Sequence, residues 1–204
     1  MQRPAKKSAA SPLPKGLPKG DKRTRTRTTL LDAALALTRE KGFEHTTLQD
    51  VARRAGMTTG AIYGNFENRD ELFMALAQRQ WAAIKPAFRP GSNFAEKMHA
   101  LAEAVIAAIP ERRVAAVGAL TFRAYTLRHE AVRVQFRDAL AAGYDAGAAW
   151  FRTAIDSTEL PMSPEILVRV IYAVTEGLIF QRILTPELIS DEVIHAAFAA
   201  IASK

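Results

Sequence analysis

The stretch "AGMTTGAIYGNFENRDELF", from Ala55 to Phe73, decides how the rest of the sequence is interpreted. Gly60 and Gly64 lie inside what otherwise reads as a short helix. A glycine within a helix costs roughly 0.5–1 kcal/mol relative to alanine. Two glycines in one short helix therefore indicate an outer face that approaches another molecule closely. The alternative, that both glycines simply mark a loop, stays open at this point.

The residues on either side of this stretch predict a helix-turn-helix. Apolar residues spaced i, i+3, i+4, i+7 predict a first helix over 26–41. A second helix is expected to begin near Thr47, whose side chain can cap the free amides. Gly56 ends it, and Thr58 caps a third, short helix that runs to about Asn65. Two short helices joined by a glycine-containing turn have the arrangement of a helix-turn-helix.

The third helix has the composition of a helix that enters a DNA major groove. That groove is about 12 Å wide, so the helix needs a slim outer face. Ile62 and Phe66 are four residues apart and are expected to face inward. The small residues that keep the outer face slim are Gly60, Ala61 and Gly64. The outward hydroxyl and amide groups, able to reach phosphates and base edges, belong to Thr58, Thr59, Tyr63 and Asn65.

The positive charge of the chain is concentrated at its N-terminus. The net charge is +7, yet residues 1–30 hold nine Lys or Arg and one Asp, which is +8, so the remainder carries −1. Such asymmetry indicates a polyanionic partner, although a solubilising tail is the simpler alternative. Residues 1–22 are rich in Pro, Lys and Ser and are expected to form a disordered basic arm. Arg25 and Arg27 are expected to precede the first helix and to contact an adjacent groove.

The rest of the sequence predicts an all-α protein. A DNA-binding domain over 23–73 is expected to precede a helical domain over 74–204. Beyond the third helix, further helices are expected over 68–85, from Asn93 to before Pro110, and over 111–127, 130–155, 163–184 and 191–202, with Thr185-Pro186 as one more start signal. The absence of cysteine favours a reducing cytoplasm. No stretch of about 18 apolar residues predicts a membrane span.

The residues of this chain do not form a recognisable catalytic motif. There is no cysteine nucleophile, no glycine-rich phosphate loop and no HExxH pair. The four histidines are not clustered at metal-ligand spacing, so we expect no enzyme, no cofactor and no metal. Two alternatives stay open beside a specific DNA-binding protein. One is a helical enzyme or carrier with a basic tail, and the other is a nonspecific architectural DNA-binding protein.

One resemblance narrows these alternatives. Residues 26–73, "TRTTLLDAALALTREKGFEHTTLQDVARRAGMTTGAIYGNFENRDELF", resemble the DNA-binding domain of the tetracycline-repressor (TetR) family. The resemblance implies phosphate contacts at Thr47, Tyr63 and Arg69. It implies base contacts from Thr58, Thr59, Gly60, Ala61 and Gly64. Family members often carry histidine at Gly64 and an aromatic residue at Asn65, and this departure shifts the expected readout to Thr59 or Asn65.

The resemblance also implies a ligand-responsive repressor. Its partners would be a palindromic double-stranded DNA operator, a small apolar or amphipathic effector and a second copy of the chain. Candidate effector contacts are Phe94, His99, Glu103, Phe122 and Tyr125. Candidate dimer contacts are Leu167, Ile171, Val174, Gly177, Leu178, Ile194, Ala197, Phe198 and Ile201. Glu176 is expected to face solvent or to pair with Arg169, Arg182 or the second copy.

Overall fold

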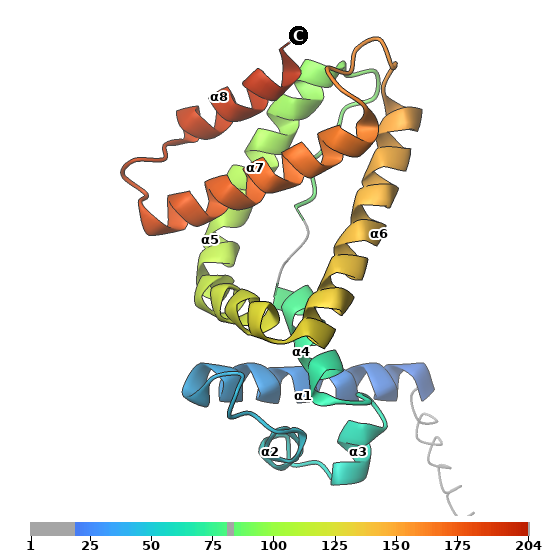
Figure 1. The fold of residues 1–204 in the computed structure, drawn as a ribbon, viewed down its shortest axis with the longest axis vertical. Helices are drawn as coiled ribbons and strands as arrows, with labels where there is room; N and C mark the ends of the chain where they lie inside the picture. The colour runs from blue at the N-terminus through green and yellow to red at the C-terminus, as the bar shows by residue number, and fades with distance from the viewer. Residues whose placement is uncertain (1–18, 81–83, 204) are drawn as a thin grey trace, which may run out of the picture.

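A computed structural model describes residues 19–80 and 84–203. In these residues the chain forms eight α-helices and no strand, which confirms the all-α class. The helices are α1 (Lys19–Lys41), α2 (Leu48–Arg54), α3 (Thr59–Tyr63), α4 (Arg69–Gln80), α5 (Phe94–Arg128), α6 (Glu130–Ala154), α7 (Pro164–Leu184) and α8 (Asp191–Ala202). Figure 1 shows α1–α3 at one end of the molecule and α5–α8 forming the body at the other. None of the helices in the described ranges is long and apolar enough to cross a membrane.

The N-terminal helices form the predicted helix-turn-helix. Thr47 caps α2 in a capping box with Asp50, and the Thr58 side chain accepts a hydrogen bond from the Ala61 amide at the start of α3. Gly56 has a φ of 64°, the left-handed conformation that favours glycine in the turn. Ile62 and Phe66 have 0% and 1% of their surface exposed, so the inner face of α3 is as predicted.

The body has its own hydrophobic core, separate from the core around α1–α4. Helix α5 packs against α8 and α7, and α6 packs against α7. Gly147 permits the close approach of α6 to α7, because a Cβ at this position would lie 2.6 Å from the side chain of Val168 on α7. The largest fully buried residues of this core are Met98, Leu167, Ile179, Ile194 and Phe198. These contacts place α8 against the first half of α5 (Figure 1).

Four predicted helix boundaries are wrong. Helix α1 begins at Lys19 rather than at residue 26, so residues 19–22 are helical and only 1–18 of the expected arm lie outside the described residues. The sequence of residues 19–22 contains no apolar side chain, so it lacks the spacing on which the prediction relied. Helix α4 ends at Gln80, and residues 84–85 are not helical. The expected domain boundary at 73–74 falls inside α4, and Thr185-Pro186 opens a turn rather than a helix.

The fourth wrong boundary is at Pro110, where the sequence predicted a break. Helix α5 runs through it without interruption. A proline removes one hydrogen bond from a helix, and helices commonly bend near one. Val105 and Ala115, on either side of Pro110, are both buried, and this packing keeps the two halves in one helix. Helix α5 bends from the body toward the DNA-binding unit (Figure 1).

A buried ion-pair cluster joins α5 to α7. The Glu176 carboxylate lies 3.3 Å from Arg112 Nη1 and also pairs with Arg123. The residues Glu176 and Arg112 are only 7% and 3% exposed. Burial lowers the pKa of Arg112, and the neighbouring carboxylate of Glu176 opposes that shift. The expected partners Arg169 and Arg182 are wrong, because the arginines that reach Glu176 come from α5.

This cluster predicts a large effect of one substitution on stability. We expect Glu176→Ala to lower the free energy of unfolding by about 3–5 kcal/mol, since Arg112 would keep its buried charge without this carboxylate. The matched control is Glu165→Ala on the same helix, which removes the exposed ion pair with Arg152. Its cost should be below about 1 kcal/mol. Urea unfolding of both variants tests the difference, and equal losses would contradict it.

Candidate nucleic-acid interface

The outer surface of α2 and α3 faces away from the body (Figure 1). Thr58, Thr59 and Gly60 are exposed, and Tyr63 has 49% of its surface accessible. An exposed aromatic side chain with a hydroxyl beside two threonines offers both stacking area and hydrogen-bonding groups. This surface matches the outward face that the sequence predicted for Thr58, Thr59 and Tyr63.

Gln49 belongs to the same surface, and the sequence analysis missed it. Its Nε2 donates a hydrogen bond to the Tyr63 hydroxyl across 3.3 Å and so links α2 to α3. The hydroxyl can still donate its own proton, because a phenol is both donor and acceptor. Gln49 therefore orients Tyr63 while leaving its donor free for an external acceptor such as a phosphate oxygen. The signal that could have identified Gln49 in the sequence was its position two residues after the Thr47 cap, where the side chain is exposed.

Thr47 is exposed at the start of α2 beside a network of charges. Its hydroxyl accepts a hydrogen bond from the Asp50 amide at 3.1 Å. The Asp50 carboxylate in turn lies 2.6 Å from Lys41 Nζ. The side-chain contacts of Lys41 and Thr47 hold the pKa of Asp50 well below its usual range. The Thr47 hydroxyl is thus held in place at the exposed start of α2.

The two glycines of α3 differ in their surroundings. A Cβ at Gly64 would lie 3.3 Å from the Gly60 carbonyl oxygen, so α3 itself restricts side chains there. A Cβ at Gly60 would meet only Thr58 Oγ1, at 3.9 Å. Packing within the protein therefore does not require the small size of Gly60, which is exposed. This is consistent with the expected close approach of a partner at Gly60 and Ala61.

The prediction that Asn65 faces outward is wrong. Its Nδ2 donates to the Ala61 carbonyl at 2.8 Å, and its Oδ1 is buried. Asn65 therefore ends α3 by satisfying one of its last carbonyl groups. An asparagine amide can hydrogen-bond to a backbone group of its own helix instead of to another molecule. The residue type alone did not show which of the two Asn65 does.

Arg25 and Arg27 lie on α1 instead of preceding it, and their surroundings differ. Arg27 Nη1 donates to the Asn65 carbonyl at 2.6 Å, and its guanidinium lies 4.3 Å from the centre of the Phe66 ring. Arg25 is exposed. Arg27 thus fastens the end of α3 to α1, whereas Arg25 presents charge at the surface.

Arg69 is directed toward the body in this structure. It donates to the Glu44 carbonyl at 3.2 Å and to the Tyr125 hydroxyl at 2.9 Å. The phosphate contact that the family resemblance implies for Arg69 would compete with these two hydrogen bonds. That contact stays a prediction.

Comparison with known proteins places this surface in a known family. The family model described as "Bacterial regulatory proteins, tetR family" matches residues 30–76, which include α2, α3 and most of α4. Residues 30–76 therefore form a tetR-family domain. The sequence resemblance is thereby confirmed.

Curated relatives match only part of the chain. The probable acrEF/envCD operon repressor of Escherichia coli (strain K12) is 45% identical over 49 residues, which is 24% of this chain and 22% of the repressor. The chain thus matches about a fifth of that relative's length.

Solved structures resemble most of the chain, including its helical body. NalD, the secondary repressor of the MexAB-OprM multidrug efflux pump in Pseudomonas aeruginosa, has a TM-score of 0.57 at 23% identity and covers 88% of this chain and 94% of its own. The multidrug binding protein EbrR, complexed with imidazole, has a TM-score of 0.64 at 20% identity and covers 92% of this chain and 98% of its own. At these identities the likeness shows the fold.

The five candidate effector residues do not form one site in this tetR-family structure. Phe94 is buried in the core of the body. Phe122 and Tyr125 belong to the other core, together with residues of α1–α4. His99 and Glu103 are exposed on α5. The aromatic residues of α5 were predicted to line one pocket. The two ends of α5 instead pack against different parts of the protein.

Part of the predicted dimer face is wrong. Leu167, Ile194 and Phe198 are fully buried in the core of their own subunit. Ile171, Leu178 and Ile201 are partly buried against that core, Val174 and Ala197 have intermediate exposure, and Gly177 is exposed. Apolar spacing identified a helix face correctly but did not show whether it faces its own core or a partner.

The Gln49–Tyr63 contact yields a prediction about DNA affinity. Tyr63→Phe should weaken binding to all duplexes similarly, because it removes a hydroxyl suited to phosphate rather than to a particular base. Folding stability should hardly change, since the hydroxyl is exposed. Mobility-shift titrations and thermal unfolding measure the two quantities. Unchanged affinity for every duplex would contradict a backbone contact at Tyr63.

The two arginines of α1 form a matched pair for a second prediction. Arg25→Ala should leave the melting temperature unchanged and reduce the log–log salt slope of DNA binding by about 0.9 per lost phosphate contact. Arg27→Ala should lower the free energy of unfolding by about 1–2 kcal/mol, because it removes a hydrogen bond and a cation–π contact. The reverse pattern would show that the roles are exchanged.

Proposed function

We propose that this protein is a transcriptional repressor that binds a palindromic operator as a homodimer in the cytoplasm and releases it when a small molecule binds. The observation that carries the proposal is the exposed face of α3 with Thr58, Thr59 and Tyr63, inside the segment that matches the tetR-family model. A helix with such a face fits the major groove, and its flanking hydroxyls suit phosphates.

The surface of α7 and α8 supports the homodimer. Both helices carry a second apolar face that their own subunit leaves exposed. Ile166 and Leu184 on α7 are 55% and 64% exposed, and Val193 on α8 is 39% exposed. The smaller residues on the same faces are Ala173, Gly177, Ala196 and Ala200. An exposed apolar surface on two adjacent helices is what a four-helix interface between two copies needs.

The effector would be a small apolar or amphipathic molecule that binds the helical body. NalD and EbrR, which share this fold, are described as a repressor of a multidrug efflux pump and as a multidrug binding protein. An effector acts if it favours a conformer whose two α3 helices fit successive grooves poorly. The proposal needs only this differential affinity between two conformers.

Selection of binding sites from random duplexes tests the proposed function. A specific dimer should enrich a palindrome whose half-sites are about one helical turn apart. Salt titrations with the enriched and a scrambled duplex then separate the alternatives. A carrier or enzyme would bind neither duplex, and an architectural protein would bind both equally. Either outcome would overturn the proposal.

The dimer face predicts the effect of a charge at Gly177. A Cβ at Gly177 would meet nothing within 4 Å, so Gly177→Glu should fold normally. We expect a monomer with at least tenfold weaker operator binding, because the charge would enter the seam and the two half-sites would no longer be bound together.

Gly143→Glu on α6 is the matched control, since a Cβ there also meets nothing within 4 Å. It should stay dimeric and keep its operator affinity. Sedimentation at micromolar concentration measures the association of both variants. A Gly177→Glu protein that is still dimeric would disprove this interface.

A further inference from the structure

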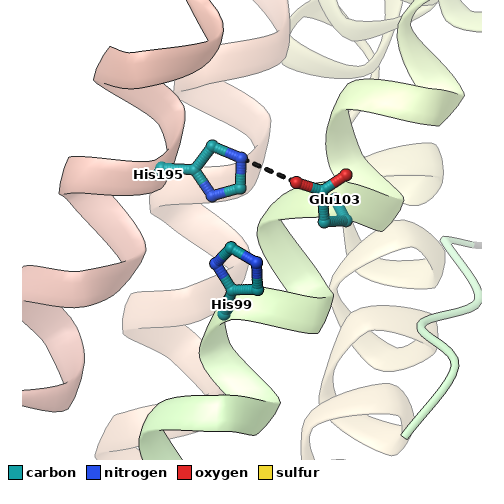
Figure 2. Close-up of side chains that lie close together, drawn as sticks. All are labelled: His99, Glu103 and His195. Carbon is teal, nitrogen blue, oxygen red and sulfur yellow. Dashed lines mark ion pairs between the residues drawn. The ribbon is translucent and has the colours of Figure 1, made fainter.

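Two histidines that are far apart in the sequence meet in the structure. His99 and Glu103 lie one turn apart on α5, and His195 faces them from α8 (Figure 2). His195 Nε2 is 2.8 Å from a Glu103 carboxylate oxygen, and the two imidazole rings stack with centroids 4.8 Å apart. One possible ligand atom from each residue lies within 4.8 Å of the other two. The expectation that the histidines do not cluster is therefore wrong.

We propose that His99, Glu103 and His195 form a binding site for a divalent transition-metal ion of the zinc class. Residues four apart on a helix share one face, so His99 and Glu103 can bind the same ion. Tetrahedral zinc with ligands at about 2.0–2.1 Å places the ligand atoms about 3.3 Å apart. His99 and Glu103 are exposed, and their side chains can turn by the small amount that this spacing requires.

The second nitrogen of His195 supports a cation at this cluster. When Nε2–H donates to Glu103, Nδ1 carries a lone pair, and this atom is buried with no hydrogen-bond partner among the described residues. A buried polar atom without a partner costs free energy. A metal ion that binds through Nδ1 would use this lone pair, whereas an ion that binds through Nε2 would leave Nδ1 protonated and still without a partner. A hydrogen-bonded His195–Glu103 pair alone leaves Nδ1 unsatisfied.

The surroundings leave room for further ligands. The cluster opens into a shallow groove of about 290 Å³ whose other walls are small side chains, namely Ala95, Ala199, Ala202 and Ser203. Water can therefore complete the coordination of the ion. Two nitrogen donors and one carboxylate favour zinc, cobalt or nickel over magnesium and calcium, which prefer oxygen. Such an ion would tie α8 to the first half of α5.

A cobalt titration of the full-length chain tests this site. The protein is prepared without a polyhistidine tag and is freed of metal with a chelator. Co²⁺ should bind with a stoichiometry of one and give the intense visible absorption of a low-coordinate nitrogen–oxygen site. Zn²⁺ should abolish that absorption by displacement, and Mg²⁺ should not. No saturable binding of Co²⁺ at micromolar concentration would overturn the proposal.

Variants assign the binding to these residues. His99→Ala and His195→Ala should each weaken Co²⁺ binding at least tenfold, and Glu103→Gln should weaken it less. The control is His45→Ala, since His45 is an exposed histidine of the DNA-binding unit. That variant should bind Co²⁺ like the wild type.

Thermal unfolding is a second readout that does not depend on absorption. Zn²⁺ should raise the melting temperature of the wild type and of His45→Ala, because it binds only the folded state, but not that of His195→Ala. If the double variant of His99 and His195 binds Co²⁺ like the wild type, the ion lies elsewhere and the assignment is wrong.

Discussion

The hydroxyl of Tyr125 joins the DNA-binding unit to the body. It accepts a hydrogen bond from Arg69 at 2.9 Å and donates one to Asp70 at 3.1 Å, both in the first turn of α4. The ring is fully buried and packs edge-on against Phe73, with centroids 5.6 Å apart. Burial raises the pKa of Tyr125, so the phenol keeps the proton that it donates to Asp70. The position of α3 relative to the body depends on this contact, because α4 follows directly after α3.

Helix α5 connects this junction to the rest of the body. Its first half carries the His99–Glu103 face against α8, its middle carries Arg112 against Glu176 of α7, and its last turn carries Tyr125. A ligand that shifted α5 relative to α7 would therefore move the start of α4. In the proposed repressor this would change the separation of the two α3 helices, provided that the ligand prefers one of the two arrangements. The buried Arg112–Glu176 pair resists such a shift, since separating it would break an ion pair in a buried environment.

Local chemistry explains what could be predicted from the sequence. The caps at Thr47 and Thr58 and the helix end at Gly56 depend on a few neighbouring residues, and all three were predicted correctly. Contacts between distant residues were not predictable from spacing. The meeting of His99 with His195, and of Glu176 with two arginines of α5, depends on how α5, α7 and α8 pack. Asn65 shows the same limit at short range, because its amide could face outward or cap Ala61, and only the path of the chain decides between them.

The two faces of α7 show why periodicity alone misplaced the dimer contacts. Leu167, Ile171 and Leu178 follow helical spacing and pack against their own core. The face formed by Ile166, Ala173, Gly177 and Leu184 follows the same spacing and is exposed. A helix that is apolar on both faces needs a second surface to cover it, whereas a helix at the surface of a monomer is polar on one side. The sequence therefore contained apolar spacing on two faces of α7, and the packing of the first face leaves the second face available for the proposed dimer contact.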